Sequence, residues 1–272
     1  MSSDAAKTHP YHMVEPSKWP FVGAVGGFTT AVGLIVWAKD GPSIPFFIGI
    51  AILLYTMYAW WKDVIAEANN GVDHTPEVKH GLRFGMILFI TSEVMFFFAF
   101  FWAYFNSNIP ALSFAASPVW PPEGIVPLKT WDVPFLNTLI LLSSGATVTY
   151  AHHAIQLGDH KRCANGLILT VILGLIFTGF QAYEYIHATY GLSDGIYGST
   201  FYLATGFHGA HVIIGTCFLL VCFLRVRKGD FSAKTHIGFE AAAWYWHFVD
   251  VVWLFLFCCV YWWGNFGFVF PE

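Results

Sequence analysis

Glu93 is a lone carboxyl residue in a long apolar stretch, and Phe89 and Phe97 lie one helical turn away on the same face. A carboxyl group is costly to bury in a membrane-spanning helix, so such groups are enriched at functional sites. One interpretation is therefore an acid that exchanges protons or reacts with a carbodiimide. The alternative is a hydrogen-bonded carboxyl group that joins its helix to a neighbouring one. The residues alone leave both interpretations open.

Histidines and one aspartate form a second set of polar residues in apolar stretches. His208 and His211 are three residues apart on one helix face, and such a pair can supply two ligands to a metal ion. The sequence offers no second pair at a matching depth, so we expect hydrogen-bonding histidines and no metal site. His247 and Asp250 have the same spacing, and we expect them to contact each other.

These residues lie in a chain whose composition is that of a membrane protein. Charged residues make up 11% of its 272 residues, whereas an ordinary soluble domain carries roughly 25%. Aromatic residues make up 19%, and the mean hydropathy is +0.57, so polar side chains are too few to cover a water-soluble globule. The net charge of -4 argues against nucleic-acid binding, which requires a basic surface.

Seven apolar stretches are long enough to cross a membrane as helices, which takes about 20 residues each. They cover residues 19–38, 43–61, 82–105, 134–153, 164–185, 199–224 and 244–264. The sequence therefore predicts an all-α membrane protein. Its expected parts are a tail at 1–18, two N-terminal helices at 19–61, a loop at 62–80, a five-helix bundle at 81–264 and a tail at 265–272. A surface extension of the second helix is the alternative to the loop, and the Pro-rich segment 117–124 is expected to be extended.

Lys and Arg residues indicate the direction of the helices, because they accumulate on the cytoplasmic side of a membrane. Eleven of the 13 fall in the N-terminal tail and in the second, fourth and sixth loops. Lys39 and Lys129 fall on the other side. We therefore expect the N-terminus in the cytoplasm and the C-terminus outside.

Four long segments carry a resemblance to a known family. They are GMILFITSEV at 85–94, TYAHH at 149–153, YGSTFYLATGFHGAHVIIG at 197–215 and FEAAAWYWHFVDVVWLFL at 239–256. The last segment closely resembles the final helix of subunit III of cytochrome c oxidase, and the other three are similar to further parts of the same subunit. The resemblance extends from Trp19 to Gly264. The chain is therefore identified as a member of this heme-copper oxidase subunit family, of the bacterial type.

The resemblance implies a fold in which the two N-terminal helices are splayed from the five-helix bundle by a lipid-filled cleft. It also implies a non-catalytic subunit of a proton-pumping terminal oxidase, which reduces O2 to water. Such a subunit stabilises the catalytic heme-copper subunit I beside the copper-bearing subunit II, holds structural phospholipids and supports proton uptake from the cytoplasmic side. Heme and copper belong to those partners. In agreement, no His in this chain has a Tyr four residues later, as the catalytic subunit's motif requires.

The resemblance also assigns roles to individual residues. Glu93 matches the family's buried, carbodiimide-reactive glutamate. Seven residues match positions around lipid headgroups at the cytoplasmic rim of the cleft: Trp60, Trp61, Glu67, His74, Arg225, Lys228 and His236. The spacing of Arg225 and Lys228 independently suits a phosphate group, although ordinary positive-inside anchoring explains it as well. Eight of the 12 histidines are expected on the cytoplasmic side, where they form either a proton-collecting surface or a merely solvated face.

Two other functions remain as alternatives. The chain is compatible with the equivalent subunit of a quinol oxidase, because other subunits bind the electron donor. An independent proton translocator that uses Glu93 is less favoured, because the sequence has no internal repeat. The expected location is a bacterial inner (plasma) membrane with a periplasmic C-terminus, and the mitochondrial inner membrane is the alternative.

Overall fold

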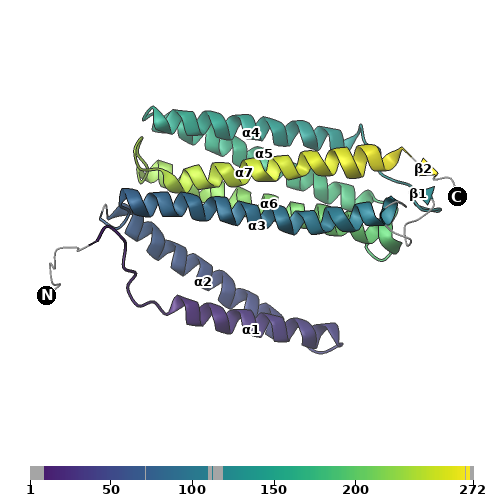
Figure 1. The fold of residues 1–272 in the computed structure, drawn as a ribbon, viewed down its shortest axis with the longest axis horizontal. Helices are drawn as coiled ribbons and strands as arrows, with labels where there is room; N and C mark the ends of the chain where they lie inside the picture. Colours follow the sequence, from purple (N-terminus) through teal and green to yellow (C-terminus); the bar gives the residue numbers. More distant parts are fainter. Residues whose placement is uncertain (1–8, 71, 110–111, 113–118, 267, 270–272) are drawn as a thin grey trace. The chain divides into compact units, whose positions relative to one another are not determined.

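The computed structural model describes residues 9–70, 72–109, 112, 119–266 and 268–269. Within them, seven helices are long and apolar enough to cross a membrane, which confirms the expected all-α membrane fold (Figure 1). Their bounds are α1 Trp19–Ala38, α2 Ile44–Asn69, α3 Pro76–Asn108, α4 Val133–Gln156, α5 His160–His187, α6 Gly195–Lys228 and α7 Ile237–Leu256. The last helix continues as a π-helix, η1 (Phe257–Trp262), and a 3-10 turn, η2 (Trp263–Asn265). The ends of both expected tails, 1–8 and 270–272, lie outside the described residues.

Several helices extend further than the apolar stretches that predicted them. α2 ends at Asn69 rather than at 61, and α3 begins at Pro76 rather than at 82. The length of an apolar stretch reflects the thickness of the membrane. A helix, in contrast, ends where its backbone N–H and C=O groups find other hydrogen-bond partners. At the start of α3, the Thr75 hydroxyl accepts a hydrogen bond from the Val78 N–H at 3.2 Å, and proline suits the first helical position. Within the expected cytoplasmic loop at 62–80, residues 62–69 continue α2 and residues 76–80 begin α3, so the second helix does extend beyond its apolar stretch.

The chain divides into two compact units, Met1–Leu82 and Arg83–Glu272. In the first unit, α1 packs against α2 as a helical hairpin (Figure 1). A Cβ atom at Gly33 would lie 2.6 Å from Phe46 Cα, and one at Gly49 would lie 2.7 Å from Thr30 Cα. Glycines at these two positions therefore let the backbones of the two helices touch, as small residues do between membrane helices.

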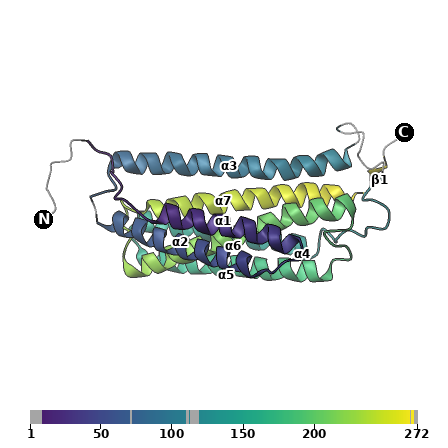
Figure 2. The ribbon, with the colours of Figure 1, turned by 90° about the horizontal axis from the view of Figure 1, so that it is seen from below.

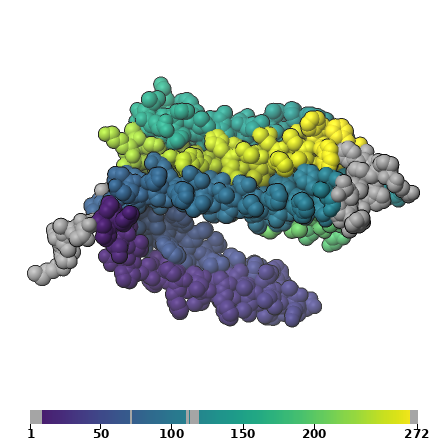
Figure 3. Space-filling view, viewed as in Figure 1, coloured from purple at the N-terminus to yellow at the C-terminus, as the bar shows by residue number. Residues whose placement is uncertain are grey.

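In the second unit, α5 lies between α4 and α6, and α7 packs against both α4 and α6. Trp246 and Trp253 of α7 are buried, and their ring N–H groups donate to Ser144 and Thr138 of α4, both at 2.9 Å. α3 runs beside α7 in two views at right angles (Figures 1 and 2), and the two helices lie in contact in the space-filling view (Figure 3). Three side chains of α3 join the buried core: Phe97, Phe101 and Tyr104.

Two short strands of the second unit follow the C-terminal ends of α3 and α7. The strand β1 (Val119–Trp120) pairs antiparallel with β2 (Phe268–Val269), with Val119 opposite Val269. The end of the chain therefore returns to the segment that precedes α4. Of the extended segment expected at 117–124, residues 119–120 are this strand and 117–118 lie outside the described residues.

The outward faces of the spanning helices remain apolar. Phe28 of α1, Phe98 of α3 and Ile186 of α5 are 72%, 57% and 78% exposed. An apolar surface of this extent requires apolar surroundings, which are lipid or another membrane subunit.

Candidate functional site

The clearest polar site within the spanning helices joins Glu93 of α3 to His211 of α6. Glu93 Oε2 lies 2.8 Å from His211 Nε2, and the other ring nitrogen, Nδ1, lies 2.6 Å from the carbonyl oxygen of Phe207. Both residues lie near the middle of their helices, and so within the membrane. The sequence indicated each residue separately, and the fold brings them together across 118 residues of chain.

The hydrogen bonds of His211 determine how the pair shares a proton. A carbonyl oxygen can only accept, so Nδ1 donates to Phe207. Nε2 then either accepts the proton of a protonated Glu93 or, in an imidazolium ring, donates to the carboxylate. In both states the pair carries no net charge, which lowers the cost of keeping a carboxyl group within a membrane. The site can therefore hold a proton without leaving an uncompensated charge.

Aromatic rings enclose the imidazole of this pair more completely than the carboxyl group. The rings of Phe97 and Tyr245 lie 4.9 and 6.3 Å from the His211 ring. The His211 side chain is 11% exposed, and that of Glu93 is 21% exposed. The carboxyl group is therefore the more exposed member of the pair.

His208 lies one turn from His211 but contacts other helices. Its Nε2 lies 3.2 Å from the carbonyl oxygen of Val249, and its ring packs 5.7 Å from Phe177 and 5.2 Å from Trp253. His208 therefore packs against α5 and α7, whereas His211 packs against α3 and α7. Within the described residues, no group of three or more His, Cys, Asp or Glu side chains is placed to bind a metal ion.

His247 and Asp250 of α7 form a second polar group together with α4. His247 Nδ1 lies 3.4 Å from Asp250 Oδ2, and its Nε2 lies 3.0 Å from Thr149 Oγ1. The Asp250 carboxyl group lies against Gly145, where a side chain would collide with it. The spacing along α7 indicated the contact between His247 and Asp250. It did not indicate that Thr149 and Gly145 of α4 contact these two residues.

The sequence interpretation missed a further buried carboxyl group, Glu184, near the C-terminal end of α5. Glu184 is 3% exposed, and its Oε1 accepts hydrogen bonds from the Tyr261 hydroxyl at 2.5 Å and from the Gln181 amide at 3.2 Å. The available signal was the three-residue spacing of Gln181 and Glu184 at the end of an apolar stretch, which places both on one face. That face is known to be buried only once the helices are packed.

Comparison with known proteins shows the family to which the chain belongs. The family model for cytochrome c oxidase subunit III matches residues 9–265. The chain belongs to this family. It is 56% identical over 262 residues to cytochrome c oxidase subunit 3 of Triticum aestivum, and the matched region covers 96% of this chain and 98% of the relative. It is 54% identical over 261 residues to the same subunit of Xenopus laevis, and the matched region covers 96% of this chain and 100% of the relative. The expected family is therefore confirmed.

Four of the residues that the subunit III resemblance assigned to lipid lie in the first unit. Trp60 and Trp61 lie on α2 and are 41% and 57% exposed. Glu67 lies about two turns further along α2, and His74 lies in the segment between α2 and α3. Exposed tryptophans suit the boundary between membrane and water.

The pKa of His74 is shifted by its surroundings. Burial lowers the pKa of His74 below its ordinary value of 6.5, and the nearby His12 and Lys79 act in the same direction, against Glu67 and Asp73. A lowered pKa means that the folded state binds a proton less readily than the unfolded state. The resulting stabilisation is complete above pH 6.5 and is lost as the pH falls toward the folded-state pKa.

This shift predicts a pH-dependent opening of the segment between α2 and α3. Below about pH 6, amide hydrogen exchange there should speed up beyond its intrinsic pH dependence in the native chain. The increase should be smaller in His74→Gln, which has no proton to gain. Exchange measured by mass spectrometry between pH 5 and 8 tests this, and identical profiles for the two proteins would contradict it.

The other three residues assigned to lipid lie where α6 meets α7. Arg225 is already engaged by protein groups, since its Nε lies 3.6 Å from Asp230 Oδ2 and its guanidinium carbon lies 4.2 Å from the centre of the Phe231 ring. Its side chain is 13% exposed. Lys228 is exposed, and His236 is half-buried. The expected joint binding of phosphate by Arg225 and Lys228 is therefore not preformed, and Lys228 is the more accessible cation.

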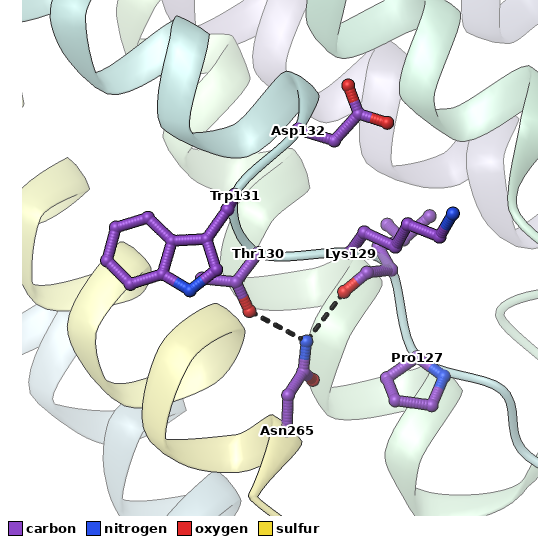
Figure 4. A pocket seen from close by; sticks show the side chains of 7 residues that line it. Pro127, Lys129, Thr130, Trp131, Asp132 and Asn265 are labelled. Carbon is purple, nitrogen blue, oxygen red and sulfur yellow. Dashed lines mark hydrogen bonds between the residues drawn. The ribbon is translucent and has the colours of Figure 1, made fainter.

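A pocket of about 520 Å³ lies before the start of α4 in the second unit. It is lined by residues 127–132 and by Asn265 (Figure 4). Asn265 Nδ2 donates to the carbonyl oxygen of Leu128 at 2.6 Å and to Thr130 Oγ1 at 3.1 Å, which ties the end of η2 to this segment. None of the candidate site residues lines this pocket, so it is separate from the candidate site.

Proposed function

We propose that the chain is the non-catalytic subunit III of a proton-pumping cytochrome c oxidase, which reduces O2 to water. The observation that carries the proposal is the family match over residues 9–265. The relatives are named subunits of cytochrome c oxidase, which favours cytochrome c over quinol as the electron donor. The proposed partners are the catalytic heme-copper subunit I and the copper-bearing subunit II, which hold the redox centres.

The relatives also bear on the location of the complex. Those from Triticum aestivum, Xenopus laevis and the alga Prototheca wickerhamii come from organisms with mitochondria. They favour the mitochondrial inner membrane over the bacterial plasma membrane. In that membrane the N-terminus would lie on the matrix side, which corresponds to the cytoplasmic side of a bacterium, because eleven of the 13 Lys and Arg residues accompany it.

A native mass spectrum of the complex purified through a tag on this chain tests the proposal. We expect one copy of this chain together with heme-bearing and copper-bearing subunits, and phospholipids bound to the assembly. Isolation of the chain without such subunits would contradict the proposal. If the chain alone then acidified liposomes, the alternative of an independent proton translocator would be supported.

The proposed role in phospholipid binding rests on the residues at the two helix junctions. Lys228 carries an exposed charge at the end of α6, close to Arg225 and His236 in sequence. A lysine near an anionic headgroup contributes about 1 kcal/mol of attraction. Arg225 serves this proposed site by holding the turn between α6 and α7 through Asp230.

Lys228→Gln should therefore lower the number of phospholipids retained by the purified complex, with assembly unchanged. The expected loss of affinity is roughly five-fold for the headgroup at this position, which corresponds to about 1 kcal/mol. Lipid extraction and quantitative mass spectrometry measure the change. Lys234→Gln is the matched control, because Lys234 is also exposed but lies outside the assigned set. Equal lipid loss in the two variants would contradict a site at Lys228.

The proposed support of proton uptake rests on the histidines expected on the N-terminal side of the membrane. His12 Nε2 lies 3.5 Å from Asp73 in the first unit, and the rings of His152 and His236 lie 5.5 Å apart in the second. Histidine side chains are suited to relaying protons to a neighbouring subunit. Turnover that is the same above about pH 8 after the loop histidines are replaced by glutamine would contradict this role.

A further inference from the structure

Several buried polar atoms near the C-terminal end of α5 have no hydrogen-bond partner in the described part of the chain. Glu184 Oε1 is bonded to Tyr261 and Gln181, but the other carboxyl oxygen, Oε2, is bonded to nothing. The amide oxygen of Gln181 and the hydroxyl group of Tyr190 are also without partners. Glu184, Gln181 and Tyr190 are only 3%, 5% and 4% exposed, so bulk water does not satisfy these atoms.

Asn137 of α4 adds a hydrogen-bond donor and an acceptor at about the same depth along the helices as Gln181 of α5. Ala151 of α4 lies against Gly166 of α5, where an added Cβ would be 2.8 Å from the Ala151 Cβ. Asn137 lies fourteen residues before Ala151, on the same helix face, and residue 180 lies fourteen residues after Gly166. Because α4 and α5 run in opposite directions, Asn137 is about level with residue 180, one residue before Gln181. It is 0% exposed, and neither its amide nitrogen nor its amide oxygen has a partner.

A dry site of this composition would be unfavourable. Buried donors and acceptors that lack partners lose their hydrogen bonds to water and gain nothing in return, and they are rare in folded proteins. Internal water occupies places where two to four polar groups converge. The four residues offer three oxygen acceptors, an amide nitrogen and a hydroxyl donor.

Tyr190 also connects the group to the surface. Together with Ile125 and Asp194, it lines a pocket of about 510 Å³ beside the segment between α5 and α6. Tyr190 therefore lies between this pocket and the interior of the second unit.

We infer that Asn137, Gln181, Glu184 and Tyr190 form a buried water-binding site. Ordered water there bridges Glu184 Oε2, the free amide oxygen of Gln181, the Asn137 amide and the Tyr190 hydroxyl. Since Glu184 is also bonded to Tyr261, this water ties α4 and α5 to η1 and to the loop after α5. The site uses none of the residues of the Glu93 and His211 pair.

A structure of the purified native complex, at a resolution that shows ordered water, tests the inference. We expect at least one water density within hydrogen-bond distance of Glu184 Oε2 and of a second residue of the group. Asn137→Leu keeps a similar volume without the amide and should lose at least one of these waters. Thr200→Val is the matched control, because the Thr200 hydroxyl is bonded within its own helix, to the Ile196 carbonyl oxygen at 2.7 Å, and all the waters should remain.

Three results would overturn the inference. The first is a native map without water at the site, with the Asn137 amide bonded directly to Gln181 or Glu184. The second is a density ringed only by oxygen atoms at the shorter distances typical of a metal ion. The third is an unchanged set of waters in Asn137→Leu. If that variant fails to assemble, the native map alone decides.

Discussion

Replacing Gly49 by valine should separate α1 from α2 and speed amide hydrogen exchange in both helices roughly 100-fold. Residue 49 faces the backbone of α1, and a Cβ atom added there would lie 2.7 Å from Thr30 Cα. Backbone atoms do not move aside as a flexible side chain does. Overpacking costs about 1–3 kcal/mol, and a β-branched residue at a backbone contact belongs at the upper end of that range. Hydrogen exchange of the purified complex, followed on peptides from both helices, measures the effect.

Gly27→Ala is the matched control for this prediction. A Cβ at position 27 of α1 would meet no atom within 4 Å, so alanine fits without strain. It should preserve the protection of both helices and add up to about 1 kcal/mol of helix propensity. Unchanged exchange in Gly49→Val would mean that the two backbones are not in contact.

Removing the Glu93 carboxyl group by Glu93→Ala should weaken the packing of α3 on α6 by about 1–3 kcal/mol. His211 Nε2 would lose its partner in a side chain that is 11% exposed, and water cannot easily replace it. Glu93→Gln should leave assembly and proton pumping nearly intact, because an amide N–H can donate to Nε2 while Nδ1 still donates to Phe207. Thermal dissociation of the chain from the complex, together with pumping assays, measures both variants.

Ser92→Ala is the control for the Glu93 variants. The Ser92 hydroxyl is bonded within its own helix, to the Phe89 carbonyl oxygen at 2.7 Å, so its removal should change neither stability nor pumping. A Gln variant that assembles normally but no longer pumps would contradict the structural role. It would instead favour the interpretation of Glu93 as an acid that exchanges protons.

The sequence by itself determined the number of spanning helices and the family. Preference for membrane over water is a property of about 20 consecutive side chains, so seven apolar stretches were enough to predict the seven helices. Contacts within one helix are equally local, and the three-residue spacing of His247 and Asp250 indicated a contact that measures 3.4 Å. The end of α2 at Asn69 was less predictable, because polar residues beyond the membrane remain helical without any change in apolar pattern.

Only the tertiary structure decided which polar groups meet. It joins Glu93 to His211, turns Arg225 toward Asp230, and buries Glu184 beneath Tyr261. Each side chain has several possible partners at a similar depth, and the choice depends on which helix faces pack together. That packing is set by contacts such as the one that Gly49 makes with the backbone of α1, which link residues far apart in the chain and leave no periodic pattern.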